Sequence, residues 1–103
     1  MTQTILLTFL AGLMGTNGIP HFVQGISARE YPNLTGNAPT NNAVSGLGAF
    51  AIAGALTALA HVDDHPAAAL VAGGAGAVVM TVFHARRGAY WMSKRFGKPL
   101  PEV

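Results

Sequence analysis

Three side chains that can form hydrogen bonds lie at helical spacing near the end of the first apolar run of this chain. Asn17, His21 and Gln24 follow one another at intervals that place them on one face of a helix. Such groups inside an apolar segment either bind a ligand or solute, or hydrogen-bond a neighbouring helix. The sequence leaves both roles open, and these residues are the first candidate site.

Pro20 lies within this polar segment. It cannot donate a hydrogen bond to the carbonyl of Thr16, and its ring crowds that carbonyl. We therefore predict that the helix kinks or opens at Pro20, with Gly18 easing the bend and the Thr16 carbonyl needing another partner.

A second group of candidate ligands lies further along the chain. His61, Asp64 and His65 have the ligand types for zinc or nickel. Pro66 suits the first turn of the next helix, so His65 is expected to cap that helix and Asp64 to complement its dipole. We predict no metal here, and His61, Asp64 and His65 remain weak candidates.

The sequence gives little support for a haem site or for hydrolase chemistry. His21 and His84 lie near the same ends of their segments and could hold a haem iron, but nothing else in the sequence favours a cofactor, and none is predicted. No nucleophile motif of the G-x-S-x-G type is present, and the acids lie in loops or the tail. We therefore do not expect an enzyme.

The composition indicates that these residues sit in a membrane protein. Half of the 103 residues are apolar and only 10% are charged, well below the usual share in soluble domains. There is no cysteine, which excludes disulfides and thiolate chemistry. The few basic residues do not suggest nucleic acid as a partner.

Three apolar runs are long enough to cross the ~30 Å hydrocarbon layer, at about 4–23, 43–60 and 66–83. Asn41 and Asn42 can cap the second run, and the short linker after it predicts an antiparallel hairpin of the second and third spans. The linker 27–42 reads as an irregular loop outside the bilayer. The sequence thus predicts a single all-α membrane domain of three transmembrane helices with a basic tail at 84–103.

The basic residues give the orientation. All six lie after the first or the third span, on one side of the membrane: Arg29, Arg86, Arg87, Lys94, Arg95 and Lys98. The positive-inside rule then places the loop and the C-terminus in the cytoplasm and the N-terminus outside.

The tail and the later spans carry two further patterns. Aromatic and basic residues alternate after the third span, which is typical of an interfacial segment anchored at the headgroups by Arg86, Arg87, Tyr90, Trp91, Lys94 and Arg95. Small residues recur every fourth position and predict close helix packing through Ala49, Ala53, Ala69, Gly73 and Ala77. Their excess suggests contacts with further copies or other membrane subunits.

The run from Asn17 to Ser27 resembles a pattern, N-G-x-P-H-F-x-x-G-x-S, that closes the first transmembrane span of small bacterial integral-membrane proteins of uncharacterised function. The resemblance covers little more than a tenth of the chain. It implies a bacterial inner-membrane setting and no particular activity.

These observations favour a small, non-enzymatic membrane protein that acts as a subunit or accessory component of a larger membrane complex. The alternative is a homo-oligomeric carrier or channel for a small solute, lined by Asn17, His21 and Gln24 at the Pro20 break.

Overall fold

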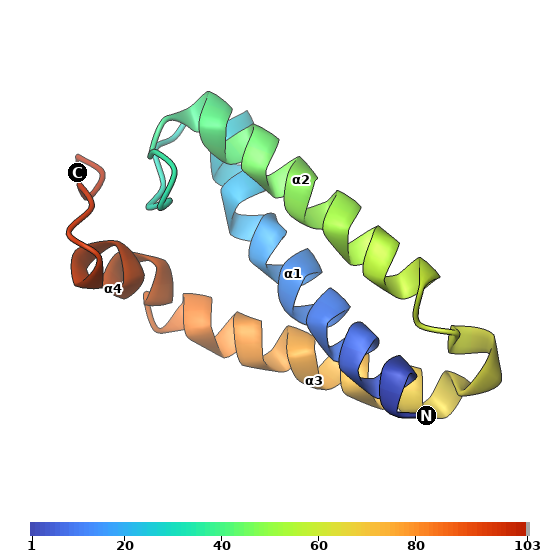
Figure 1. Cartoon of the computed structure of the whole chain (residues 1–103). Helices are drawn as coiled ribbons and strands as arrows, with labels where there is room; N and C mark the ends of the chain where they lie inside the picture. Colours follow the sequence, from blue (N-terminus) through green and yellow to red (C-terminus); the bar gives the residue numbers. More distant parts are fainter. Residues whose placement is uncertain (103) are drawn as a thin grey trace.

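The computed structural model describes residues 1–102, and all regular structure in them is helical, which confirms the predicted all-α class. Three long α-helices are followed by a short one, and Figure 1 shows how they are arranged. They are α1 (Thr2–Ile26), α2 (Pro39–Ala58), α3 (Pro66–Ala85) and α4 (Gly88–Arg95), with a 3-10 turn, η1 (Val62–Asp64), between α2 and α3. Val103, the last residue of the predicted tail, lies outside the described residues.

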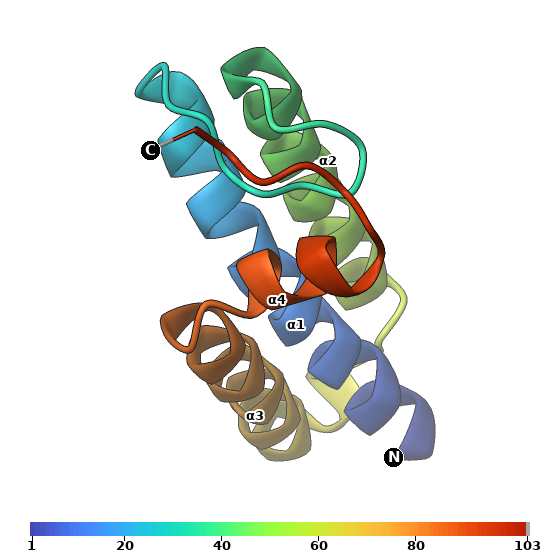
Figure 2. The same cartoon turned by 90° about the vertical axis from the view of Figure 1, so that its left-hand side faces the viewer.

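α1 is the central helix of the bundle. Both α2 and α3 pack along it, α2 in the opposite direction and α3 in the same direction, while α2 and α3 barely touch each other (Figures 1 and 2). The predicted hairpin of the second and third spans is therefore wrong. The backbone turns at His61, which has a left-handed conformation (φ 52°), and η1 then leads the chain to the other side of α1.

Glycine brings α1 and α3 together. A Cβ on Gly12 would clash with the carbonyl of Gly73 and with the backbone nitrogen of Ala77, and one on Gly76 would clash with the carbonyl of Phe9. The two backbones are therefore close enough that no side chain fits between them. Close approach of this kind is the usual basis of helix association in lipid.

A second set of close contacts joins α1 to α2. Gly18 lies against the ring of Phe50, Gly25 lies against the backbone of Ala43, and Phe22 covers Gly46. Gly18, Phe22 and Gly25 all belong to the Asn17–Ser27 motif, so this part of the motif forms a helix-packing surface.

The five residues predicted to pack lie in or beside these contacts. Ala49 and Ala69 are buried. A Cβ on Gly15 would lie 3.5 Å from the Cβ of Ala53, and Gly73 and Ala77 face Gly12.

Pro20 does not interrupt α1. The helix continues from Thr2 to Ile26 with Pro20 inside it, so the helix does not open at this proline. Gly18, which we expected to ease a bend, is instead buried against α2. The packing of α2 along this part of α1 stabilises the helical path on both sides of the proline.

Two helices are long and apolar enough to cross a membrane. They are α1 and α3. α2 has the same length as α3 but is less apolar, because Asn41 and Asn42 lie in its first turn.

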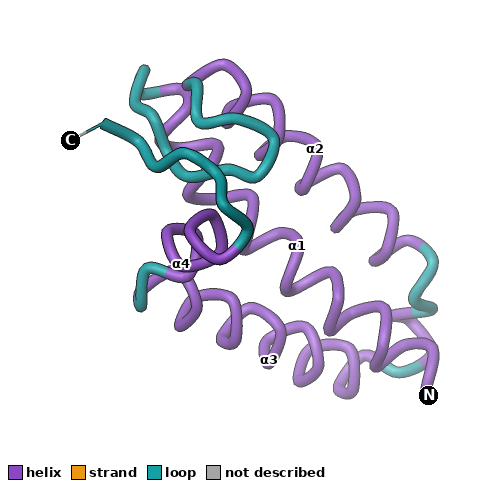
Figure 3. Tube along the Cα trace, turned by 60° about the vertical axis from the view of Figure 1, so that its left-hand side comes forward, coloured by secondary structure: helices purple, strands orange, loops and turns teal. Residues whose placement is uncertain are grey.

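The loop of residues 27–38 and the segment after α4 lie together at one end of the bundle, next to α4 (Figure 3). Asn37 Nδ2 donates a hydrogen bond of 2.8 Å to the carbonyl of Pro99 and so joins the two segments. The predicted irregular loop is shorter than 27–42, because α2 already begins at Pro39, and Tyr31 and Pro32 within it are buried against the bundle.

Candidate functional site

Asn42 is the centre of a polar cluster at this end of the bundle. The side chain is fully buried (0% exposed), and its Nδ2 donates to the carbonyls of Tyr31 and Asn37, at 3.0 Å each. Its Oδ1 accepts from His21 Nδ1 at 2.6 Å and from Asn33 Nδ2 at 3.3 Å. One amide thus connects α1, α2 and the loop.

Asn42 therefore does not cap α2, contrary to our prediction. α2 begins at Pro39, with Ala38 as its N-cap and no side-chain cap, so Asn41 and Asn42 both lie within the first turn. Their amides bond the loop: Asn41 Nδ2 donates to the Thr35 hydroxyl, at 2.9 Å, and to the Gly36 carbonyl.

The bond to Asn42 fixes the tautomer of His21. Because Asn42 Oδ1 can only accept, His21 Nδ1 carries a proton, and the Nε2 of a neutral ring is left as an acceptor. Nε2 has no hydrogen-bond partner in the part of the chain that the structure describes, and it is not fully enclosed. His21 therefore presents an unused acceptor.

A second chain of hydrogen bonds joins the loop, α3 and α1. The Tyr31 hydroxyl donates to His84 Nδ1 at 3.1 Å, and His84 Nε2 donates to Asn17 Oδ1 at 2.8 Å. Burial, together with Tyr90, raises the pKa of Tyr31 above its ordinary value of 10.0, although Arg87 opposes the shift. The hydroxyl therefore stays protonated and remains a donor.

The rings of the cluster also pack on one another. The centroid of His21 lies 5.2 Å from that of Tyr31 and 5.9 Å from that of His84, both edge to face. Tyr31 in turn meets Tyr90 of α4 edge to face at 5.9 Å, and the Arg87 guanidinium lies 4.0 Å above the Tyr90 ring. α4 is thus held to the cluster by aromatic contacts.

Replacing Tyr31 with phenylalanine is expected to lower the free energy of unfolding by about 1 kcal/mol, because it removes the bond to His84 but keeps the ring. Thermal unfolding of the protein in lipid nanodiscs measures the change. Tyr90→Phe is the matched control, since the Tyr90 hydroxyl has no hydrogen bond to any residue in 1–102. Equal effects of the two variants would show that the Tyr31–His84 bond contributes nothing.

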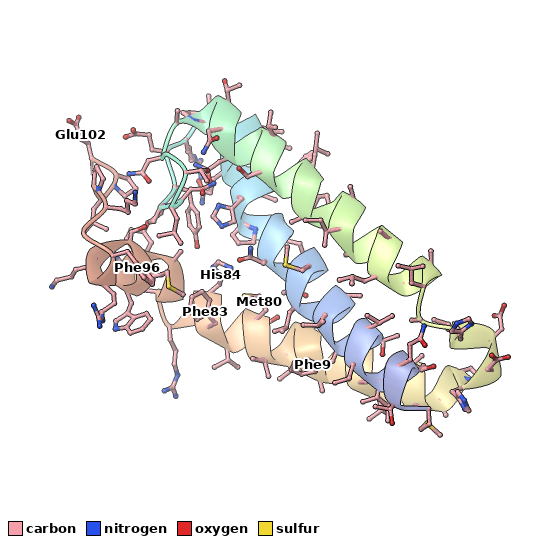
Figure 4. The ribbon with its side chains drawn as sticks, viewed as in Figure 1. Phe9, Met80, Phe83, His84, Phe96 and Glu102 are labelled. Atoms are coloured by element: carbon pink, nitrogen blue, oxygen red, sulfur yellow. The ribbon has the colours of Figure 1, made fainter. Side chains whose placement is uncertain are left out.

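A cavity of about 390 Å³ lies beside the cluster. Asn17, His21, His84, Asn33 and Ser93 contribute polar groups, and the other lining residues are apolar: Pro32, Leu34, Val79, Met80, Phe83, Ala89 and Met92. Figure 4 shows His84 and Met80 in the space between α3 and α1, with Phe83 beside them. A mostly apolar cavity with a few convergent polar groups is the usual form of a small-molecule site.

Of the four residues predicted to form the polar site, two line the cavity and two do not. Asn17 and His21 line the cavity and bond His84 and Asn42. Thr16 and Gln24 do not line it, and neither side chain has a hydrogen bond to another residue in the described range. Helical spacing had placed Gln24 on the face of His21, but the cluster is completed by other elements instead.

Sequence reasoning missed Tyr31, Asn33, Asn42 and Ser93. The first two lie in the loop, which a Pro-, Gly- and Asn-rich composition marks only as irregular. Ser93 lies on α4, 1% exposed, and its Oγ is the one fully buried side-chain oxygen or nitrogen in residues 1–102 without a hydrogen-bond partner. No spacing in the sequence indicates these contacts.

The weak metal candidates do not form a centre. Among the residues described, no three His, Asp or Glu side chains lie close enough together to hold a metal ion, and this includes His61, Asp64 and His65 at the other end of the bundle. His84 uses both ring nitrogens in hydrogen bonds, so as arranged neither is free to bind iron.

The predicted interface anchors are mostly exposed. Trp91 is 61% exposed on α4, and Arg86, Arg87, Lys94 and Arg95 are exposed around it. Tyr90 differs, because its ring packs inward on Tyr31.

Comparison of the chain with models of known protein families, with curated proteins and with solved structures finds no match.

Proposed function

We propose that this chain is a non-enzymatic integral membrane protein of three transmembrane helices, placed in the bacterial inner membrane, and that it serves as a subunit or accessory component of a larger membrane complex. The observation that carries the proposal is the long apolar surface that α1, α2 and α3 leave uncovered.

The uncovered surface is unusual for a small soluble protein. Large aliphatic side chains point outward on all three helices, including Leu70 (78% exposed), Val71 (72%), Val44 and Val78 (63% each) and Leu47 (56%). Most of the buried core consists instead of alanine, glycine and threonine. Contact of such a surface with water is unfavourable, whereas contact with lipid or with a partner helix is not.

The distribution of charge supports the orientation. Five of the six Lys and Arg residues follow α3, and Arg29 follows α1, so all of them lie at the end that holds α4 and the loop. Asp63 and Asp64 lie in η1 at the opposite end. The longest dimension, 47 Å, is close to the full thickness of a bilayer with its headgroups. This arrangement favours a cytoplasmic C-terminus and an external N-terminus.

α2 is included as the third transmembrane helix on the basis of its packing. It runs antiparallel to α1 along almost the whole of that helix, from the contact of Ala43 with Gly25 to the 2.9 Å bond from Gln3 Nε2 to the Leu59 carbonyl. Its 20 residues span ~30 Å. Asn41 and Asn42 lie at its cytoplasmic end, where they bond the loop.

Uncovered glycines support membership of a complex. Nothing lies within 4 Å of where a Cβ would stand on Gly48, Gly54 or Gly74, so these backbone positions are open on the outer faces of α2 and α3. A lipid-facing helix gains nothing from glycine, but a helix-packing face does, because glycine lets a second backbone approach.

The proposal predicts that protein purified from its own host membrane in a mild detergent runs at a defined mass well above that of its 10.6 kDa chain. Gly54→Leu or Gly74→Leu is expected to reduce this assembly by about tenfold or more, because a bulky side chain keeps a partner backbone away. Native mass spectrometry measures both. Thr2→Leu, which adds the same bulk at the exposed start of α1, is the control.

Two results would contradict the proposal. One is a lone monomer with no companion chain in the host membrane extract. The other is an assembly that survives leucine at all three of the open glycine positions.

The alternative, a carrier or channel, finds less support in the geometry. The polar cluster lies at one end, and the middle of each long helix has no polar side chain, as the stretches 9–15, 46–56 and 66–80 show. A homo-oligomer would not supply a polar path either, because each copy has the same apolar residues in the middle of its helices. The structure therefore favours binding at one end over passage across the membrane.

A further inference from the structure

We propose that the cavity beside the polar cluster binds a lipid-soluble phenol, that is, a neutral aromatic molecule with a ring hydroxyl. This inference goes beyond membership of a membrane complex and does not depend on it. It rests on three unsatisfied polar groups, on the chemistry of the remaining lining, and on the position of the cavity mouth.

The first observation is that three residues lining the cavity have hydrogen-bonding capacity left over. His21 Nε2 is an acceptor without a partner, because Nδ1 donates to Asn42. Asn17 uses its Oδ1 for His84, and its Nδ2 has no partner in residues 1–102. Ser93 Oγ is fully buried and has none. Ser93 Oγ is the fully buried one of the three, and a buried group in this state is costly unless something satisfies it. His21 Nε2 and Asn17 Nδ2 are not fully enclosed, so a molecule in the cavity can reach them.

These groups select the chemistry of the ligand. A hydroxyl donates to His21 Nε2, and the two lone pairs of its oxygen can accept from Asn17 Nδ2 and from Ser93 Oγ. A single small group therefore satisfies all three. His21 and Asn17 are one helical turn apart on α1, which places both within reach of the same atom. A carbonyl could not donate to His21 Nε2, and an apolar molecule could satisfy none of the three.

The rest of the lining selects the body of the ligand. No Asp, Glu, Lys or Arg is among the residues that line the cavity, so a charged group would be buried without a counter-ion. Met80, Met92 and Phe83 supply thioether and aromatic surfaces that pack well on a ring. The cavity thus fits a flat, neutral, aromatic molecule.

The mouth of the cavity indicates where the ligand comes from. Val79 and Leu34, both lining residues, are 52% and 44% exposed. Val79 faces outward from α3, a helix apolar enough to cross a membrane, so a molecule dissolved in the bilayer can enter sideways. Lipid-soluble phenols concentrate near the membrane interface, because their hydroxyl prefers the headgroup region and their ring prefers the hydrocarbon.

The test uses 2-naphthol as the probe and the full chain in phosphatidylcholine nanodiscs, with ¹⁵N-labelled histidine. Replacing His61 and His65, which lie at the other end of the bundle, leaves only the signals of His21 and His84, and His84→Gln then identifies those of His84. We expect a saturable shift of the His21 Nε2 resonance as the naphthol hydroxyl donates to it. The His84 signals are expected to change less, since both nitrogens are already bonded.

Two comparisons make the result decisive. 2-Methoxynaphthalene has the same ring without the donor, so it should leave His21 Nε2 unshifted. Ser93→Ala should weaken 2-naphthol binding by about tenfold without loss of folding, because its hydroxyl has no partner in the described chain to lose. Ser45→Ala, on α2 and outside the cavity lining, should bind as the parent does.

Three outcomes would overturn the assignment. They are a His21 shift that grows without saturation, an equal shift with 2-methoxynaphthalene, and a Ser93→Ala protein that binds 2-naphthol as tightly as the parent.

Discussion

Replacing Asn42 with alanine is expected to detach the loop of residues 27–38 from the bundle and to destabilise the protein by at least about 3 kcal/mol. The change leaves His21 Nδ1 and the carbonyls of Tyr31 and Asn37 without the amide that now bonds them. Each buried group left unsatisfied costs about 1–3 kcal/mol. The loss is a large share of the stability of a small domain.

Two measurements in nanodiscs test this expectation. Thermal unfolding followed by circular dichroism reports the loss of stability, and trypsin cleavage after Arg29 reports release of the loop. Asn41→Ala is the matched control, because its bonds to Thr35 and Gly36 are exposed and water can replace them. If the two variants unfold and are cleaved alike, Asn42 does not have the central role that the structure gives it.

Replacing Gly76 with valine is expected to have an effect of similar size on the other side of α1. Any Cβ at this position clashes with the carbonyl of Phe9, and a backbone atom cannot move aside as a side chain does. α1 and α3 must then separate, which also stretches the bond from His84 Nε2 to Asn17 Oδ1. We expect a loss of about 3 kcal/mol or more, since overpacking at a backbone contact exceeds the usual 1–3 kcal/mol.

Gly74→Val is the control for this change. It adds the same side chain to the same helix, but nothing lies within 4 Å of its Cβ position. Thermal unfolding should distinguish the two variants clearly, and the His84 ¹⁵N signals should change only for Gly76→Val. A Gly74→Val protein that is the less stable of the two would show that the α1–α3 contact is not where the structure places it.

The helices themselves could be predicted well from the sequence. The apolar runs at 4–23, 43–60 and 66–83 correspond to α1, α2 and α3, and Pro66 is the first residue of α3, as we predicted. Local rules suffice here, because the start and end of a helix depend on the length of the apolar run and on the residues that begin and end it. The same rules predicted a kink or an opening at Pro20, and the helix does not open there, since α1 continues through the proline and packs against α2 on this stretch.

The partners of the helices could not be predicted in this way. A short linker suggested that α2 and α3 pair, yet both pack on α1. The contacts that decide the pairing are made at single glycines, such as Gly12, Gly18 and Gly76. Whether a backbone can approach such a glycine depends on which residue of the other helix lies opposite it. The sequence contains several helix faces with small residues, and it does not show which of these faces pack on each other.

The sequence by itself determined that this protein is helical and that Asn17 and His21 are polar groups in an apolar setting. It predicted three membrane-crossing helices, of which α1 and α3 are long and apolar enough in the structure. Only the tertiary structure decided what those two residues do, because their partners Asn42, Tyr31 and His84 come from three other segments. Helical periodicity relates residues a few positions apart, whereas a hydrogen bond between segments depends on how the chain folds back. The cavity and the buried Ser93 beside it exist for the same reason, since α3, α4 and the loop enclose them only after packing on α1.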